Sequence, residues 1–313
     1  MKRLAILLLA VTALAQDKPA DKPVEETKTN IKVLQGLPTS QLIPVMAVMS
    51  NSLGVTCAHC HTAEWSADEK PAKEVARRML VMTRGLNAQH FEGKPVVSCN
   101  TCHNGHVKPN AIPLVAASGW NQIVPVKREL ALPSAADVLA SYTRALGGAE
   151  AIAKVTGRTS RGIATRMNGR TEPVSGPFTM TQDRPLKVSV DTQLSYPPEA
   201  NREVGGQFFR MTMLPEIYPS MKVVDVASVR GRDAYVVEAQ PKEGRAERLY
   251  FDVQNGLLLR RAHETQTPYG ILPEEYDFDD WRDAGNGIRA PYLMTWSRAD
   301  YRVTHKFDEI TFR

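Results

Sequence analysis

The chain has 313 residues, a formal charge of +5, 42% hydrophobic residues and 23% charged residues. These proportions are typical of a globular protein with room for two hydrophobic cores, and they exclude a largely disordered chain. Without Lys2 and Arg3 the charge falls to +3, which is too small to indicate a nucleic-acid-binding protein.

The N-terminus has the pattern of a secretory signal peptide. A basic pair is followed by a short apolar run and by Ala13-Leu14-Ala15, a small-x-small cleavage site. This run is too short to span a bilayer, and no other run is long and apolar enough to cross one. We therefore predict export to the periplasm with removal of residues 1–15, and retention of this segment as an anchor is the alternative.

Residues 16–30 are charged and poor in apolar side chains, which predicts a flexible lead-in.

Residues 31–110 contain all four cysteines and predict helices joined by loops. One helix is expected to begin near Ser40, a good N-cap residue, and to end before Gly54. A second is expected from about residue 71 to 86, because its apolar positions recur at helical spacing. These positions are Val75, Met79, Met82 and Leu86.

Both cysteine pairs belong to C-x-x-C-H motifs, at residues 57–61 and 99–103. This motif is the attachment signature of c-type haem. Two thiols about one helical turn apart can each add to a vinyl group on one edge of the macrocycle, and the next histidine then lies under the iron. The motifs predict two covalent haems c, held through thioethers by Cys57, Cys60, Cys99 and Cys102, with His61 and His103 as iron ligands.

Two other interpretations of the cysteines remain open at this stage. All four thiols could form a zinc site, or the pairs could form disulfides in an exported protein. A histidine directly after each pair, together with the export signal, favours haem. His59, His90 and His106 lie near the motifs, and we expect them at the surface or against haem propionates.

The sixth ligand of each iron has to come from another part of the chain. Met46 and Met49 lie on the helix before the first motif, and Met79 and Met82 on the helix before the second. Methionine at helical spacing is usually a packing residue, so the spacing alone does not select among the four.

The rest of the chain has a different pattern. Residues 111–133 contain several prolines and little periodicity, which predicts a linker. A helix capped by Ser134 and ended by Gly147-Gly148 is expected next, followed by strands from about residue 158. Asn255-Gly256 and Asn286-Gly287 mark hairpin turns. The prediction is an α+β chain with an all-α dihaem domain and a β-rich domain over residues 134–313.

Residues 36–57, 76–87 and 97–105 resemble the tetrahaem cytochrome subunit of photosynthetic reaction centres. In that family the axial methionine lies on the helix before its haem motif, and the matching positions are Met46 and Met79. The family carries two pairs of haems, whereas this chain has one pair. The resemblance is therefore to a stand-alone two-haem member, and a reaction-centre partner does not follow from it. His90 lies where the family has a distal histidine, but the haem that it would serve is missing.

Residues 134–313 more loosely resemble the outer-membrane lipoprotein-carrier type of half-barrel. The features in common are residues 138–148 of the capped helix and its end, the segment 248–258 and the segment 276–282. The resemblance implies a curved antiparallel sheet with a helix. Carriers of this type bind acyl chains, so a lipophilic ligand is the partner that the resemblance suggests for this domain.

Three hypotheses for the function follow. In the first, the protein is an electron carrier with two His/Met-ligated haems that exchanges electrons with redox partner proteins. In the second, one iron lacks its methionine and the open position makes the protein an enzyme. In the third, the haems serve as a redox sensor for a lipophilic ligand of the C-terminal domain. Methionine ligation on both helices favours the electron carrier.

Overall fold

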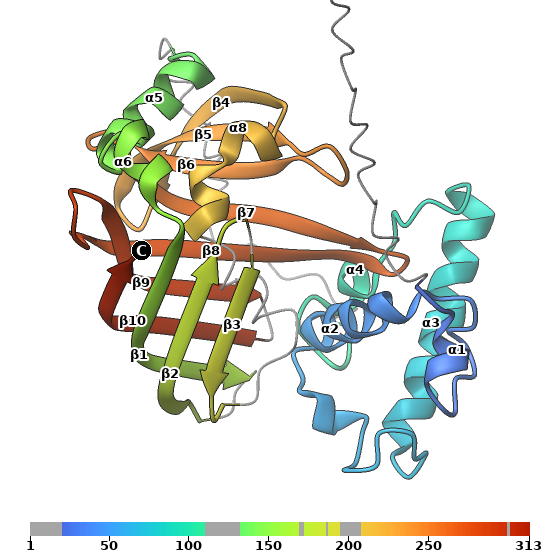
Figure 1. Ribbon diagram of the computed structural model, residues 1–313. Coiled ribbons are helices and arrows are strands. Elements are labelled where there is room, and N and C mark those ends of the chain that lie inside the picture. The colour runs from blue at the N-terminus through green and yellow to red at the C-terminus, as the bar shows by residue number, and fades with distance from the viewer. Residues whose placement is uncertain (1–20, 110–131, 169–171, 186, 195–207, 299–300) are drawn as a thin grey trace, which may run out of the picture.

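Figure 1 shows the computed structural model of the chain, which combines a group of helices with one large antiparallel sheet. The structure describes residues 21–109, 132–168, 172–185, 187–194, 208–298 and 301–313. The predicted signal peptide and all but the last two residues of the predicted linker lie outside these ranges. Within them, no helix is both long enough and apolar enough to cross a membrane.

The first part of the chain is helical, as its sequence predicts. Gly54 ends the second helix in a left-handed conformation with a φ of 66°, and Pro71 begins the third. The third helix is one turn longer than predicted and ends at His90. The elements are α1 (Val24–Thr27), η1 (Thr39–Gln41), α2 (Leu42–Leu53), η2 (Cys57–His59), α3 (Pro71–His90) and α4 (Cys99–His103).

Two expectations for this part differ from the structure. Ser40 does not cap α2; it lies in η1, and its hydroxyl and amide groups both donate to the side chain of Asp21. Residues 21–30, expected to belong to a flexible lead-in, contain α1 and pack against the other helices. Val24, an apolar residue in this charged segment, is fully buried because its side chain packs in the core of the helical part.

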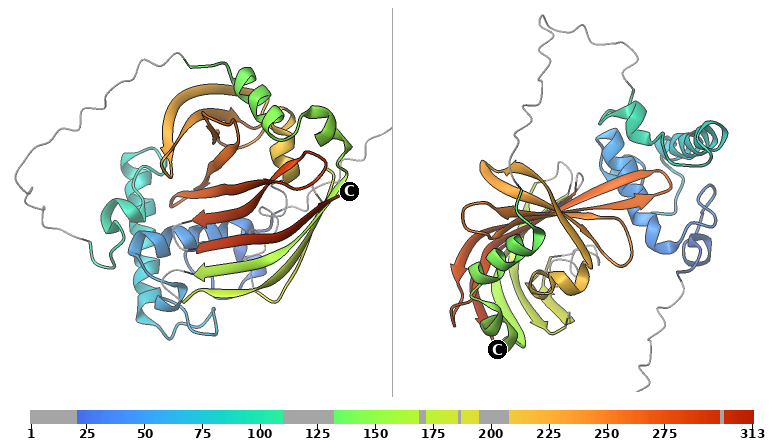
Figure 2. Two further views of the ribbon diagram at one scale, coloured as in Figure 1. Left: turned by 90° about the vertical axis from the view of Figure 1, so that its left-hand side faces the viewer. Right: turned by 90° about the horizontal axis from the view of Figure 1, so that it is seen from above.

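The second part of the chain is a ten-stranded sheet in which every pair of neighbouring strands is antiparallel. Seen from above, it curves around α8 (Leu214–Ile217), and the helical part lies to one side (Figure 2). The strand order is β3-β2-β1-β10-β9-β8-β7-β6-β5-β4. The strands are β1 (Gly157–Asn168), β2 (Val174–Asp183), β3 (Lys187–Thr192), β4 (Ser220–Val229), β5 (Arg232–Gln240), β6 (Glu247–Asp252), β7 (Leu258–Thr267), β8 (Gly270–Asp283), β9 (Arg289–Arg298) and β10 (Tyr301–Phe312).

The predicted turns and the predicted capped helix are confirmed. Helix α5 (Ala135–Ala145) begins at Ser134, whose hydroxyl accepts a hydrogen bond from the amide of Asp137 at 3.1 Å. It is followed by α6 (Ala149–Lys154). Gly256 and Gly287 each have a φ of 73° in the two Asn-Gly turns. Tyr142 of α5 packs on Phe251 of β6, so this helix covers one end of the sheet.

Candidate haem-binding site

Each C-x-x-C-H motif lies on a short helical turn. The first motif contains η2, and the amide of His61 donates to the carbonyl oxygen of Cys57 at 3.0 Å. The second motif is α4, which begins with a capping box made by Ser98 and Thr101. Consecutive cysteines on such a turn can both reach one edge of a macrocycle, as the spacing predicts.

The two motif histidines have the same hydrogen-bond arrangement. Nδ1 of His61 lies 3.0 Å from the carbonyl oxygen of Trp65, and Nδ1 of His103 lies 2.9 Å from that of His106. A carbonyl only accepts, so Nδ1 carries the proton in each ring and Nε2 keeps its lone pair for a metal. The sequence gives no signal for these bonds, because any residue supplies a backbone carbonyl.

None of the four cysteines forms a disulfide, so the four sulfurs are free for other bonds. Cys57 and Cys102 are exposed, whereas Cys60 and Cys99 are half-buried, and burial raises the pKa of these last two thiols. Over the described ranges, no three His, Cys, Asp or Glu side chains come close enough to form a metal site, so the four thiols are not gathered as the zinc alternative requires.

Helix α3 turns a polar face toward the protein and leaves its apolar stripe open. The four side chains of α3 that are buried are Arg77, Leu80, Thr83 and Asn87. The apolar stripe of the same helix is half-buried or exposed, with 44% of Val75 and 45% of Met82 accessible. An apolar stripe that packs on no protein core fits a helix that covers a haem face.

The methionines predicted as alternative ligands lie on α2 and α3. Met46 and Met49 are both half-buried and pack against the core of the helical part. Met79 is half-buried, and Met82 is more exposed on the same stripe. His59, His90 and His106 are exposed, and His90 is the last residue of α3.

Asn87 connects α3 to the segment that enters the second motif. Its side-chain Nδ2 donates to the carbonyl oxygen of Val97 at 2.7 Å, and the amide of Val97 donates to its Oδ1 at 2.9 Å. Asn87 is buried, and Val97 lies two residues before Cys99. This pair therefore fixes the position of the second motif relative to the methionine helix. No local pattern in the sequence marks Asn87 for this role.

Asp68 holds the loop that follows the first motif. It accepts hydrogen bonds from Arg77 at 2.7 Å, from Lys32 at 2.7 Å and from Asn30 at 2.9 Å. The Arg77 hydrogen bond, followed by that of Lys32, holds the pKa of Asp68 well below its usual range. The network joins residues 30–32, this loop and α3.

The C-terminal end of α2 is in close backbone contact with the end of the second motif. The amide of Gly105 donates to the carbonyl oxygen of Ser52 at 2.8 Å. A Cβ atom added to Gly54 would overlap the carbonyl oxygen of Gly105. The helix before the first motif is therefore packed directly against the end of the second motif, and only glycine at position 54 allows this approach.

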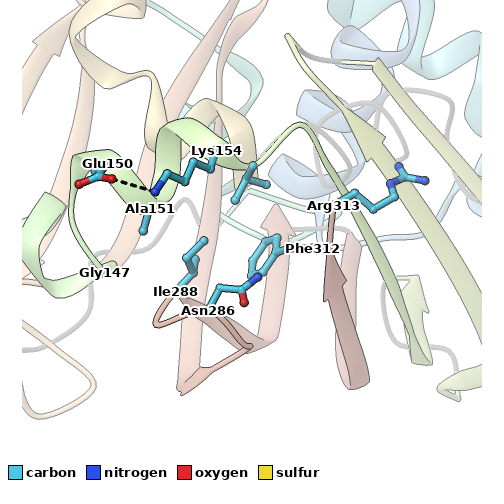
Figure 3. Close-up of a pocket in the computed structure, with 9 residues that line it drawn as sticks. Gly147, Glu150, Ala151, Lys154, Asn286, Ile288, Phe312 and Arg313 are labelled. Carbon is cyan, nitrogen blue, oxygen red and sulfur yellow. Dashed lines mark hydrogen bonds and ion pairs between the residues drawn. The ribbon is translucent and has the colours of Figure 1, made fainter.

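A separate open pocket of about 550 Å³ lies on the sheet, between α6 and the ends of β9 and β10 (Figure 3). Ile288 and Phe312 give it an apolar wall. Lys154 lines it and is paired with Glu150 at 2.8 Å. No predicted site residue lines this pocket.

Two C-x-x-C-H motifs, each with a helix beside it, are also what similar known sequences lead one to expect. Residues 7–136 match the model of a family described as photosynthetic reaction centre cytochrome C subunit. The N-terminal part of the chain resembles this cytochrome family. The chain is 35% identical over 105 residues to cytochrome c-554 of Chloroflexus aurantiacus, covering 31% of this chain and 25% of the relative. It is 30% identical over 164 residues to the reaction center cytochrome c subunit of Rubrivivax gelatinosus, covering 49% of this chain and 40% of the relative.

The chain thus spans between a quarter and two fifths of the length of these cytochromes. The other part of the predicted resemblance also has counterparts among solved structures. A LolA superfamily protein from Nitrosomonas europaea matches 58% of this chain and 94% of its own, at 8% identity and a TM-score of 0.43. A DUF1329 family protein from Desulfovibrio piger matches 56% and 92%, at 12% identity and a TM-score of 0.37. The description of the sheet rests on its own topology.

The contact between α2 and the second motif can be tested with two glycine substitutions. Gly54 and Gly93 have φ values of 66° and 77°, so alanine at either position should cost about 1–2 kcal/mol in backbone strain. A Cβ at Gly93 meets nothing within 4 Å, whereas one at Gly54 overlaps Gly105. We expect Gly54→Ala to cost about 1–3 kcal/mol more than Gly93→Ala, measured by urea unfolding of the full chain followed through its helical circular dichroism. Equal losses would contradict the contact.

Proposed function

We propose that this protein is a periplasmic electron carrier with two covalently bound haems c and His/Met axial ligation. The observation that carries the proposal is the apolar stripe of α3. Val75 and Met82 of this stripe are 44% and 45% exposed and Met79 is half-buried, on the helix that Asn87 connects to the second C-x-x-C-H motif. Packing on the protein core would bury this stripe, and a haem partner explains why it is open.

Bound haem supplies one-electron chemistry between ferric and ferrous iron. The chain's own residues hold and tune it. Cys57, Cys60, Cys99 and Cys102 would form the thioethers. His61 and His103 would bind iron through Nε2, because their Nδ1 protons are engaged by backbone carbonyls.

Met46 and Met79 are the sixth ligands in this proposal, and Met49 and Met82 are packing residues. Within each helix the two methionines are three residues apart, about 60° around the axis, so both lie on one side of the helix. The resemblance to the reaction-centre cytochromes selects the first of each pair. Methionine ligation closes both irons to small ligands, which favours electron transfer over catalysis at an open iron.

The named relatives are cytochromes, and one of them is a reaction-centre subunit. Redox proteins are the corresponding partners proposed here. The proposed location is the periplasm, because the N-terminus has the pattern of a secretory signal peptide and c-type haem motifs follow it.

A second candidate function, binding of a lipophilic acid by the sheet, is favoured by Arg158 of β1. This side chain is 1% exposed and lies between the rings of Phe208 and Phe307, with centroids 5.2 and 4.9 Å away. Among the described residues, its buried Nε and Nη2 have no hydrogen-bond partner, and Nη1 is 3.5 Å from Oε1 of Gln182. Burial lowers its pKa to about 9.

Other donors without partners lie beside this guanidinium on the inner face of the sheet. Gln182 is the cross-strand partner of Arg158, and Ser160 is the next inward residue on β1. Nε2 of Gln182 and Oγ of Ser160 are buried, and neither has a partner in the part of the chain that the structure describes. A carboxylate would satisfy such a cluster of donors, and the surrounding aromatic rings suit an apolar tail. Phe312, also a cross-strand partner of Arg158, lines the 550 Å³ pocket.

The haem content is the direct test of the first proposal. Denatured, purified protein exported from a host with a c-type maturation system should retain haem, with a mass excess of two haems over the processed chain. A Cys57→Ser, Cys60→Ser double variant should retain one haem, and the corresponding change at Cys99 and Cys102 should do the same. A mass equal to the bare chain, or zinc in place of iron, would refute the proposal.

Methionine ligation can be tested residue by residue. Met46→Ala or Met79→Ala should each remove about half of the weak far-red band of Met-ligated ferric haem, lower one haem's potential and open that iron to carbon monoxide. The matched controls, Met49→Leu and Met82→Leu, should cost less than about 1.5 kcal/mol and leave the band intact. If Met82→Leu abolishes the band of the second haem and Met79→Ala does not, the assigned register is wrong.

The second candidate predicts that Arg158 distinguishes an acid from its ester. The full chain should bind a long-chain fatty acid at least about tenfold more tightly than its methyl ester, because a charged hydrogen bond contributes about 1.5–3 kcal/mol. Arg158→Leu should remove this preference and raise the melting temperature of the ligand-free protein, since it removes a buried unpaired charge. Arg184 is the control, because it stacks on Phe209 but donates to two carbonyls, so Arg184→Leu should lower the melting temperature. Equal binding of acid and ester would count against the site.

A further inference from the structure

The β7–β8 hairpin extends past the rest of the sheet and ends against α2 (Figure 1). Its tip is a tight turn in which Thr267 pairs with Gly270 and the Thr267 hydroxyl donates to the Gly270 carbonyl oxygen at 2.8 Å. A long hairpin with a tightly bonded tip can connect the sheet to the helical part of the chain. The residues at its tip contact that part as follows.

Tyr269, at the tip, is a core residue of the helical part. It is 2% exposed and belongs to a cluster whose other buried members all lie between residues 24 and 80. Val45 of α2 and Leu80 of α3 are among them, 0% and 4% exposed. Met46 and Met49 pack on the same cluster. The ring of Tyr269 therefore lies in the core shared by the helices that bear the methionines.

The hydroxyl of Tyr269 adds a directional contact. Nη2 of Arg84, on α3, donates to this hydroxyl at 2.6 Å and lies 2.8 Å from the carbonyl oxygen of Val33. The guanidinium carbon is 5.8 Å from the centre of the tyrosine ring. The sheet thus contributes both apolar packing and a hydrogen bond to the interface between α2 and α3.

The residues after Tyr269 contact α2 and the start of the second motif. A Cβ at Gly270 would lie 3.2 Å from both Val48 and Ser98, so the backbone of the hairpin closely approaches α2 and the N-cap of α4. Leu272 is buried against Ala47 and Val48. The contact is continuous along the hairpin and includes elements next to both haem motifs.

We infer that Tyr269 is a positioning residue for haem ligation, through which the sheet fixes α2 against α3. The inference rests on the proposed dihaem function. Close-packed cores transmit small displacements, so a shift of α2 moves the sulfur that it presents to iron. This holds for either methionine of α2, because both pack on the cluster that contains Tyr269. The C-terminal sheet is then a determinant of the potential of the first haem.

The test uses the full-length holoprotein, with two variants of Tyr269 and a matched control. Tyr269→Ala removes the ring and Tyr269→Phe removes only the hydroxyl. Tyr218 serves as the control because it is 1% exposed and its hydroxyl donates to Glu247 at 2.5 Å, but it lies in the core of the sheet. Tyr218→Ala and Tyr218→Phe should lower the melting temperature and leave both haem potentials unchanged.

For Tyr269→Ala we expect loss of about half of the far-red band, carbon monoxide binding at one ferrous haem and a fall in one potential. The ratio of oxidised to reduced haem at fixed potential should rise at least about tenfold for that haem, which corresponds to about 59 mV for a one-electron couple. Tyr269→Phe should shift the same potential in the same direction by less and keep the band. The second haem should be unchanged.

An unchanged band and unchanged potentials in both Tyr269 variants, with only the melting temperature lowered, would overturn the inference. If Tyr269→Ala does not fold, Tyr269→Phe and Arg84→Gln decide the matter, because each removes the 2.6 Å hydrogen bond and keeps the ring. A haem count on every sample separates the two proposals. A wild-type protein without two haems contradicts the proposed function, whereas a dihaem protein that is insensitive to Tyr269 contradicts only this inference.

Discussion

The packing of the end of α2 on the second motif is the constraint on which the helical part depends. Gly54 and Gly105 approach so closely that the backbone of one motif unit contacts that of the other. The helix that precedes the first motif is thereby a neighbour of the second. Each C-x-x-C-H motif on its own is a short turn and a loop, with few buried side chains. The glycine contact joins the two motif units into one structure.

Among the described elements, helix α2 contacts three that bear on the candidate site. The second motif lies at its C-terminal end, the cluster around Val45 and Leu80 joins it to α3, and the β7–β8 hairpin contacts Ala47 and Val48. The core of this part is small in comparison with that of the sheet. A helical group with so little protein core gains stability from any group that covers its open apolar side chains, such as a macrocycle or a sheet hairpin. Because its own hydrophobic core is small, the helical part depends on the β7–β8 hairpin for part of its packing.

The sequence predicted those features whose chemistry is local. These features depend only on neighbouring residues: they are the C-x-x-C-H motifs, the Asn-Gly turns, the Ser134 cap, the end of α2 at Gly54 and the start of α3 at Pro71. Ser40 failed as a cap, although its type is suitable, because Asp21 engages its hydroxyl from outside the helix. Val24 was assigned to a flexible segment because its neighbours are charged. Its burial depends on residues distant in the sequence, and composition over a short window does not contain that information.

The features that sequence reasoning missed either join distant segments or use backbone groups that any residue supplies. Asn87 bonds to Val97 across a loop, and the motif histidines bond to carbonyls that have no side-chain signature. Tyr269 follows a Thr-Pro pair that indicates a turn, and a turn residue is expected at the surface. In this chain the tip of the hairpin is buried because the other part of the protein covers it. The sequence predicts a boundary between two domains, yet the hydrophobic core of the first includes Tyr269 of the second. The proposed haem ligation therefore depends on the sheet as well as on the two motifs.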